Sequence, residues 1–147
     1  MQIGKTAQNA ISAISYLAEC YRDKVGPVSS QAVADARGLS KPLAAKILTT
    51  LSQSGIVRGS TGPGGGYQLG MPPAEIKLLD VVTHFELQNK AVMCPFGEGW
   101  CGNFDPCPLH DEIMALGEDL ERFLVENNFG GFAMPGCSSK RPPVDGK

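Results

Sequence analysis

The sequence has few of the residues on which acid–base enzymes depend, with two histidines, three tyrosines and one tryptophan among 147 residues. It also lacks an apolar run of the ~18 residues that a membrane-spanning helix needs, so we expect no membrane partner. No basic stretch followed by a long apolar segment stands at the N-terminus, which predicts no secretory signal and a cytoplasmic location. Without paired catalytic acids or a nucleotide-binding motif, we expect a protein that is not an enzyme.

The net charge of −2 conceals an uneven distribution of charged residues. Residues 1–70 carry seven Lys or Arg against three acidic residues, whereas residues 71–147 carry six basic and twelve acidic residues. A basic N-terminal half is suited to attract phosphate groups. Chance unevenness would produce the same counts, so the charges alone do not decide for nucleic acid.

Three helices are predicted in the first third of the chain. The apolar spacing predicts a helix over 5–22, and a second, short helix is predicted over 29–37 with Ser29 or Ser30 as its cap. Gly38 supplies a turn, and a third helix runs from its cap at Ser40 to about Ser54, where Gly55 closes it. Two short helices joined by a tight glycine turn are typical of a helix-turn-helix.

A β-hairpin is predicted directly after these helices. The segments 56–58 and 67–69 are strand-like, and they flank the glycine-rich sequence 61–66. A hairpin in this place is the wing of a winged helix-turn-helix, and its glycines let backbone N–H groups approach a phosphate. A nucleotide-binding loop is excluded because no Gly-Lys-Ser/Thr follows. A glycine-rich hairpin without a ligand remains the alternative.

The predicted fold is mainly α with a small β-hairpin wing, and a long C-terminal dimerisation helix follows the winged helix-turn-helix. We divide the chain into a winged helix-turn-helix over 1–71, a linking helix over 72–87, a cysteine-rich loop over 88–107, a dimerisation helix over 108–128 and a flexible tail over 129–147.

Apolar residues in the predicted dimerisation helix follow a heptad pattern. They are spaced four, three, four and three, at Leu109, Ile113, Leu116, Leu120 and Phe123. The opposite face of this helix is strongly acidic. This favours a partner helix from a second subunit over packing against the protein's own core.

Three of the five cysteines lie close together, at Cys94, Cys101 and Cys107, and His110 follows the third. Soft thiolates select zinc, cuprous copper or iron–sulfur clusters, and three thiolates with one imidazole also suit structural zinc. The spacing does not separate these metals, and unliganded thiols or a reversible disulfide are further alternatives. Cys20 lies near the apolar stripe of the first helix and is expected to be a buried free thiol.

Taken in order, these features resemble the IscR/NsrR/CymR group of bacterial transcription regulators, the Rrf2 family. The resemblance covers Met1 to about Asn127. It depends on the segment 51–57, on the wing sequence 62–69 and on three cysteines that precede a long helix.

The resemblance implies a homodimer whose long C-terminal helices cross. It also implies a helix-turn-helix in the major groove and a wing in the adjacent minor groove of a palindromic or partly palindromic operator. We therefore expect a DNA-binding regulator, acting as a repressor, whose operator binding responds to an iron–sulfur cluster that senses redox state, nitric oxide, iron or cluster supply. The alternatives are a winged-helix regulator with structural zinc or no metal, and an interaction module that has lost DNA binding.

The resemblance also implies the cluster ligands. Some members use a histidine three residues after the third cysteine, where this chain has His110. Others use a carboxylate in the first helix, where this chain has Gln8. We therefore expect a 2Fe–2S cluster, with 4Fe–4S as the alternative, on Cys94, Cys101, Cys107 and His110.

The expected DNA contacts lie in the third helix and in the wing. They are Ser40, Lys41, Lys46 and Thr49 in the helix, and Arg58, Thr61, Gly64, Gly65 and Gly66 in the wing. The chain departs from the family pattern at Thr61, where many relatives have arginine, and at Ala44 and Ala45, where polar residues are usual. These departures leave the target sequence open.

Overall fold

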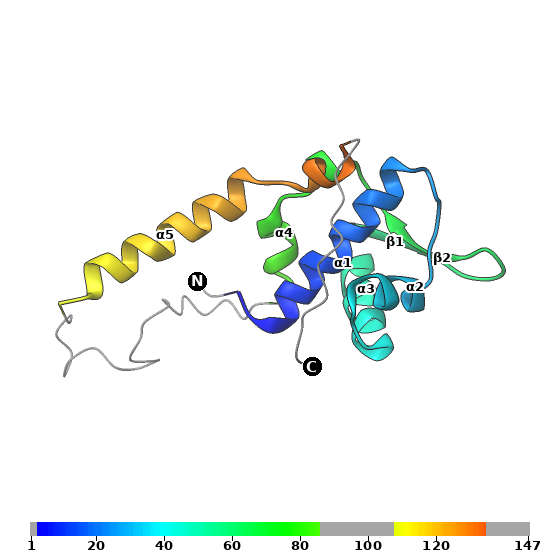
Figure 1. Ribbon diagram of the computed structural model, residues 1–147, viewed down its shortest axis with the longest axis horizontal. Coiled ribbons are helices and arrows are strands. Elements are labelled where there is room, and N and C mark those ends of the chain that lie inside the picture. The colour runs from blue at the N-terminus through cyan, green and yellow to red at the C-terminus, as the bar shows by residue number, and fades with distance from the viewer. Residues whose placement is uncertain (1–2, 86–107, 135–147) are drawn as a thin grey trace.

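The computed structural model describes residues 3–85 and 108–134. In chain order the elements are α1 (Lys5–Arg22), α2 (Ser30–Arg37), α3 (Lys41–Ser54), β1 (Val57–Ser60), β2 (Gly66–Leu69), η1 (Pro73–Glu75), α4 (Leu78–Val82), α5 (His110–Glu126) and η3 (Phe129–Ala133). The described residues therefore form a mainly helical winged helix-turn-helix with a two-stranded hairpin, as the sequence predicted (Figure 1). No helix among these described residues is long and apolar enough to cross a membrane.

Helix α1 lies at the centre of the fold. Its buried face includes Ile14 and Leu17 together with several alanines, and it contacts α2, α3, β2, α4 and η3. Small alanine side chains let these neighbours approach the helix closely. Cys20 is buried and free, as expected. Tyr21, in the last turn of the helix, is 48% exposed.

Local capping fixes the helix-turn-helix. The Ser29 hydroxyl accepts a hydrogen bond from the Ala32 N–H at 3.1 Å, and the Ser40 hydroxyl accepts one from the Leu43 N–H at 3.3 Å. Between them, Gly38 ends α2 in the left-handed conformation with φ of 67°. These caps satisfy N–H groups that a helix end would otherwise leave without partners, so the turn between α2 and α3 has a defined geometry.

The hairpin pairs Val57 with Leu69 at its base and Ser60 with Gly66 at its outer end. Its tip contains a turn in which the Gly65 N–H donates to the Gly62 carbonyl at 2.9 Å. Pro63 and Gly64 stand at the two central positions, and Gly64 has φ of 76°. Proline followed by a residue of positive φ is the requirement of a type II turn, which explains this local sequence.

The predicted helix over 72–87 is interrupted. The structure has the short 3-10 helix η1, an extended Lys77 and then α4, and residues from 86 lie outside the described part. Lys77 is extended because it pairs with Asn128, and the Leu78 N–H donates to the Asn127 carbonyl at 3.0 Å. The backbone after η1 therefore bonds to the chain that follows α5, and a continuous helix is lost.

The predicted flexible tail over 129–147 begins too early. The first residues of this range form η3, and the Phe129 side chain is fully buried with its ring centroid 6.0 Å from that of Phe132. The Phe129 N–H donates to the Ile76 carbonyl at 3.1 Å, and an Arg22 guanidinium nitrogen donates to the Met134 carbonyl at 3.2 Å. Burial of the two aromatic rings against α1 fixes this segment, and residues 135–147 lie outside the described part.

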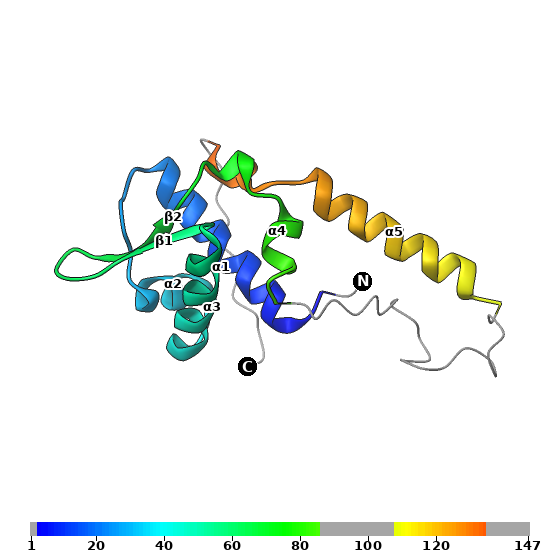
Figure 2. The ribbon, with the colours of Figure 1, turned by 180° about the vertical axis from the view of Figure 1, so that it is seen from behind.

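Helix α5 projects away from the body of the protein, at the end opposite the hairpin tip (Figure 2). Leu124 is its one buried residue, and it packs with Ala7 and Val82 near the helix C-terminus. Leu116 and Phe123, both in the predicted heptad pattern, are each 52% exposed. Most of the apolar face of α5 therefore has no contact with the core of its own chain.

Candidate nucleic-acid interface

The two sides of α3 differ sharply in burial. Ala44, Ile47, Leu48 and Leu51 are fully buried against the core. The opposite side, which we call the outer face of α3, consists of Pro42, Ala45, Lys46, Thr49 and Gln53. All of these are exposed except Ala45, which is half-buried. Residues three and four apart share one side of a helix, so these side chains form a continuous row.

The predicted contacts of the third helix lie on or beside this outer face. Lys46 and Thr49 are exposed members of it, and Lys41 is exposed in the first turn. Ser40 is also exposed, but its hydroxyl oxygen already caps the helix. A serine hydroxyl that accepts one hydrogen bond can still donate its own hydrogen. The structure thus places these four residues along the exposed side of α3, from its N-cap to its third turn. The spacing rule could also have found Pro42 and Gln53, which sequence reasoning missed.

The hairpin carries the remaining predicted residues, of which Gly65 and Gly66 are half-buried. Arg58 is exposed on β1 opposite Gln68, and Thr61 and Gly64 are exposed at the tip. Gly64 has open space around it, so its backbone can be approached from outside. In Figure 1 the hairpin tip extends beyond α2 and α3, away from α5. The helix-turn-helix and the wing therefore occupy the same end of the molecule.

Gly66 also has a packing role that the sequence did not reveal. A Cβ atom at this position would lie 2.5 Å from the Val28 carbonyl oxygen, and its φ of 151° favours glycine. The close approach comes from two backbone hydrogen bonds between Val28 and Tyr67, at 2.9 and 2.7 Å. Gly66 thus allows the segment before α2 to pair with the wing, which fixes the outer part of β2 relative to the helices.

Not all basic residues of the N-terminal half face solvent. The Arg37 guanidinium pairs with the Glu19 carboxylate at 2.9 Å, and their side chains are only 10% and 16% exposed. It also donates to the Ser12 carbonyl at 3.1 Å and lies 5.2 Å from the centre of the Tyr16 ring. Arg37 therefore holds α2 against α1. The exposed cations of the candidate interface are Lys41, Lys46 and Arg58.

The cysteines of the predicted metal site, Cys94, Cys101 and Cys107, lie outside the described residues. His110 is described, and it is the first residue of α5, where it is half-buried. Within residues 3–85 and 108–134 no three His, Cys, Asp or Glu residues are grouped as a metal site. Three thiols and an imidazole are a donor set that suits an iron–sulfur cluster or zinc, so the residues of the chain fit either group by their chemistry.

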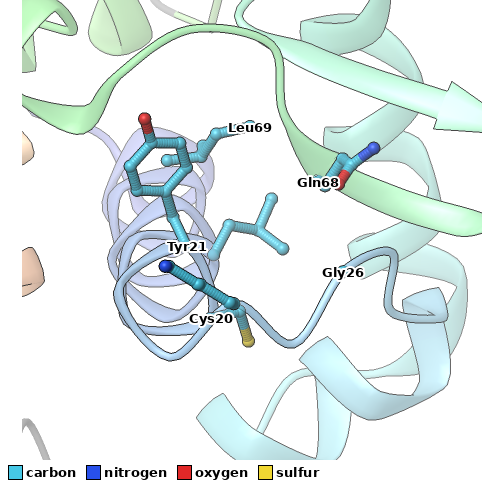
Figure 3. Close-up of a pocket in the computed structure, with 7 residues that line it drawn as sticks. Cys20, Tyr21, Gly26, Gln68 and Leu69 are labelled. Carbon is cyan, nitrogen blue, oxygen red and sulfur yellow. The ribbon is translucent and has the colours of Figure 1, made fainter.

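A hollow of about 280 Å³ lies between the C-terminal end of α1 and the base of the wing (Figure 3). It is lined by Leu17, Cys20, Tyr21, Lys24, Gly26, Gln68 and Leu69. Burial raises the pKa of the Cys20 thiol, although a hydrogen bond with Tyr16 acts in the opposite direction. A thiol that keeps its proton is a weak nucleophile, so Cys20 is suited to packing rather than to chemistry.

Comparison with known proteins agrees with this arrangement. The Rrf2 family model, described as an iron-dependent transcriptional regulator, matches residues 3–130. An HTH-type transcriptional regulator of Aquifex aeolicus is 30% identical over 125 residues, which cover 84% of this chain and 85% of that protein. The HTH-type transcriptional regulator IscR of Klebsiella pneumoniae is 28% identical over 125 residues, which cover 85% of this chain and 76% of that protein.

Two solved structures share the fold. IscR of T. potens gives a TM-score of 0.67 at 23% identity, covering 88% of this chain and 83% of that chain. CymR, the global cysteine regulator of B. subtilis, gives a TM-score of 0.69 at 21% identity, covering 90% and 96%. At this level of identity the structures establish the winged helix-turn-helix fold and nothing further.

Proposed function

Because this chain belongs to the Rrf2 family of transcriptional regulators, we propose that it represses transcription by binding operator DNA as a homodimer, under the control of an iron–sulfur cluster. The family is one of regulators and not of enzymes. A bacterial regulator acts where the chromosome lies, so the proposed location is the cytoplasm.

The observation that supports DNA binding most strongly is the outer face of α3. Lys46 and Thr49 stand exposed on the second helix of a helix-turn-helix, with Lys41 at its N-terminal end. In this class of protein the second helix enters the major groove and its N-terminal residues contact the bases. In the proposed complex Ser40 and the lysines bind phosphates, and Thr49 meets the base edges.

The wing supplies the second set of proposed contacts. Arg58, Thr61 and the glycines 64–66 would meet the sugar–phosphate backbone or the minor groove beside the α3 site. The exposed tip, its positive-φ glycines and the hydrogen bonds that hold β2 against Val28 support this role. Phosphate contacts of this kind position the protein on the duplex and carry no sequence information.

The exposed row on α5 supports the homodimer. Leu109, Leu116 and Phe123 are 43%, 52% and 52% exposed, and they lie in the heptad pattern. Such a row is stable in water when a second apolar helix covers it. In the proposed dimer two α5 helices cross, and each subunit presents its α3 to one half of a palindromic or partly palindromic site.

The proposed cluster ligands are Cys94, Cys101, Cys107 and His110. A cluster bound to them would supply a group whose oxidation state or loss changes the charge and geometry at the start of α5. His110 is the first residue of that helix, so as a ligand it would connect the proposed metal site to the proposed dimer interface. Of the iron–sulfur clusters, 2Fe–2S is the form we propose and 4Fe–4S is the alternative. The competing proposal is a structural zinc on the same residues, or no metal, with another signal controlling the protein.

DNA binding is tested by Lys46→Ala, with Lys77→Ala as a control that removes an exposed lysine away from α3. Each lost phosphate contact lowers the slope of log Kd against log salt concentration by about one unit. A homodimer loses one contact in each subunit, so its slope should fall by about two units. Fluorescence anisotropy with a duplex selected from a randomised pool measures this slope. An unchanged slope for Lys46→Ala, or an equal decrease for Lys77→Ala, contradicts the assignment.

The homodimer is tested by Leu116→Glu, with Ala115→Glu as a matched control on a neighbouring exposed position outside the heptad row. Loss of one buried leucine on each subunit costs about 3 kcal/mol or more, which raises the dimer dissociation constant about 100-fold. Sedimentation equilibrium should show a monomer for Leu116→Glu and a dimer for the control. A dimer of unchanged affinity would place the interface elsewhere.

The cluster is tested by the absorption spectrum of protein purified without oxygen, together with iron, sulfide and zinc analysis. Visible bands with matching iron and sulfide are expected, and His110→Ala should alter the spectrum because it exchanges one ligand. A colourless protein with one zinc per chain would support the zinc alternative. An unaltered cluster spectrum in His110→Ala would remove that residue from the ligand set.

A further inference from the structure

The outer face of α3 combines two kinds of side chain. Pro42, Ala45 and Thr49 present hydrocarbon groups, whereas Lys46 and Gln53 carry long polar side chains. The two alanines that depart from the family pattern differ in position. Ala44 is fully buried in the core, while Ala45 lies on the outer face and is partly exposed. Of the two, only Ala45 can meet DNA.

The three hydrocarbon groups lie in one line along the helix. Pro42, Ala45 and Thr49 are spaced three and four residues apart, which places them on the same side. With a rise of 1.5 Å per residue they span roughly 10 Å. Base pairs repeat about every 3.4 Å, so the row faces about three consecutive base pairs.

Pro42 and Ala45 have no side-chain donor or acceptor, so they cannot read the hydrogen-bonding edges of bases. The one apolar group that a base pair displays in the major groove is the C5 methyl group of thymine. Alanine and the methyl group of threonine are the side chains that contact it. Cytosine at the same place would present an amino group to this surface, and burial of that group without a partner is unfavourable.

On the basis of the proposed DNA-binding function, we propose that Ala45 and Thr49 select operator half-sites by contact with thymine methyl groups. Each half-site then carries thymine at the positions that face these two residues, within the segment of about three base pairs beneath the row. Thr49 makes this contact through its methyl group rather than its hydroxyl. Lys46, beside the row, contributes charge, and thymine preference comes from the small apolar groups.

The test uses full-length protein and operator duplexes selected from a randomised pool. Replacement of a contacted thymine by deoxyuridine removes the methyl group and leaves every hydrogen-bonding edge unchanged. Binding is expected to weaken about fourfold for each contacted methyl group, the amount that corresponds to one buried carbon. Deoxyuridine outside the contacted segment is the control and should leave Kd unchanged.

Protein variants assign the methyl groups to residues. Thr49→Ser removes one methyl group and keeps the hydroxyl, so it should abolish the response to deoxyuridine at its thymine. Thr49→Val keeps a methyl group and loses the hydroxyl, so it should retain that response. Ala45→Gly should abolish the response at the neighbouring thymine, and any loss of helix stability affects thymine and deoxyuridine duplexes equally, so the ratio of their Kd values isolates the contact.

The outcomes separate this inference from the proposed function. Selected duplexes that bind tightly and respond equally to thymine and deoxyuridine would overturn the methyl readout while DNA binding stands. A response that Thr49→Val abolishes and Thr49→Ser retains would assign the contact to the hydroxyl and also overturn it. Failure to bind any duplex in a salt-dependent way would overturn the proposed function and this inference together.

Discussion

Replacement of Gly66 by alanine tests whether the wing is fixed to the helices by its backbone. The added Cβ would lie 2.5 Å from the Val28 carbonyl oxygen and 2.7 Å from its carbonyl carbon. Both are backbone atoms, so no side-chain rotation relieves the contact. The chain can relieve it only by opening the pairing between Val28 and Tyr67, whose two hydrogen bonds measure 2.9 and 2.7 Å.

The expected cost follows from these two effects. Two backbone hydrogen bonds contribute about 1 kcal/mol each, and alanine at a positive φ costs about 1–3 kcal/mol. Gly66→Ala should therefore lower the free energy of unfolding by about 3–5 kcal/mol. Gly62→Ala is the matched control, because Gly62 has φ of 87° in the same hairpin but open space around its Cβ position. Its cost is the conformational part alone, about 1–2 kcal/mol.

The assay is urea unfolding at one fixed protein concentration, since a dimer's stability depends on concentration. Operator binding measured beside it should weaken for Gly66→Ala, because the wing is no longer held relative to α3. Equal losses of stability for Gly66→Ala and Gly62→Ala would refute the steric argument. Contacts other than the Val28–Tyr67 hydrogen bonds would then hold the wing against the helices.

Three further perturbations test the packing described above. Phe129→Ala should lower the free energy of unfolding by about 3–5 kcal/mol in denaturant titration, with a smaller loss for the half-buried Phe132→Ala. Arg37→Ala should cost about 2–3 kcal/mol, because it removes the guanidinium that pairs with Glu19 between α1 and α2; a change below 0.5 kcal/mol, as at ordinary surface sites, would contradict that role. Burial raises the pKa of Cys20, so the folded state keeps a proton that the unfolded chain loses as pH rises above about 8.5. The free energy of unfolding should therefore fall from pH 7.5 to pH 9.5 (roughly one unit to either side of that thiol pKa) by more in the native protein than in Cys20→Ala, and equal pH dependence would contradict the assignment.

The helix-turn-helix could be predicted because its signals are local. Ser29, Gly38 and Ser40 act within four residues of themselves, and a pattern of caps and turns can be recognised without knowledge of the tertiary fold. The hairpin was predictable for the same reason, since Pro63 and Gly64 specify their own turn.

The errors occur where distant segments meet. The helix over 72–87 is interrupted at Lys77 because Asn128 pairs with it, and no local feature of the sequence reveals that partner. Phe129, which lies in the predicted tail, is likewise fixed by a distant partner, because its N–H donates to the Ile76 carbonyl. The basic count of residues 1–70 includes Arg37, because a charge count does not show which side of a helix faces the core.

The candidate site was predictable in part. The exposed positions of Lys46, Thr49 and Arg58 follow from helix and hairpin periodicity, and the structure agrees with them. Ala44 is buried and Ala45 is not, because adjacent residues on a helix differ by about 100° in direction. Which of the two faces the core depends on how α3 packs, and the sequence does not reveal that packing. The steric role of Gly66 could not be predicted from the hairpin sequence, because the backbone that it contacts belongs to Val28, outside the hairpin.

The most direct test of cluster control compares operator binding by one preparation with and without its cluster. Protein purified without oxygen is divided, one half is stripped of iron by a chelator, and the Kd for the same duplex is measured at the same salt concentration. If the cluster controls DNA binding, the two values differ by about 5- to 150-fold, the range of ordinary allosteric coupling. Equal Kd values for a preparation that contains iron and sulfide would contradict cluster control and leave a DNA-binding regulator whose signal lies elsewhere.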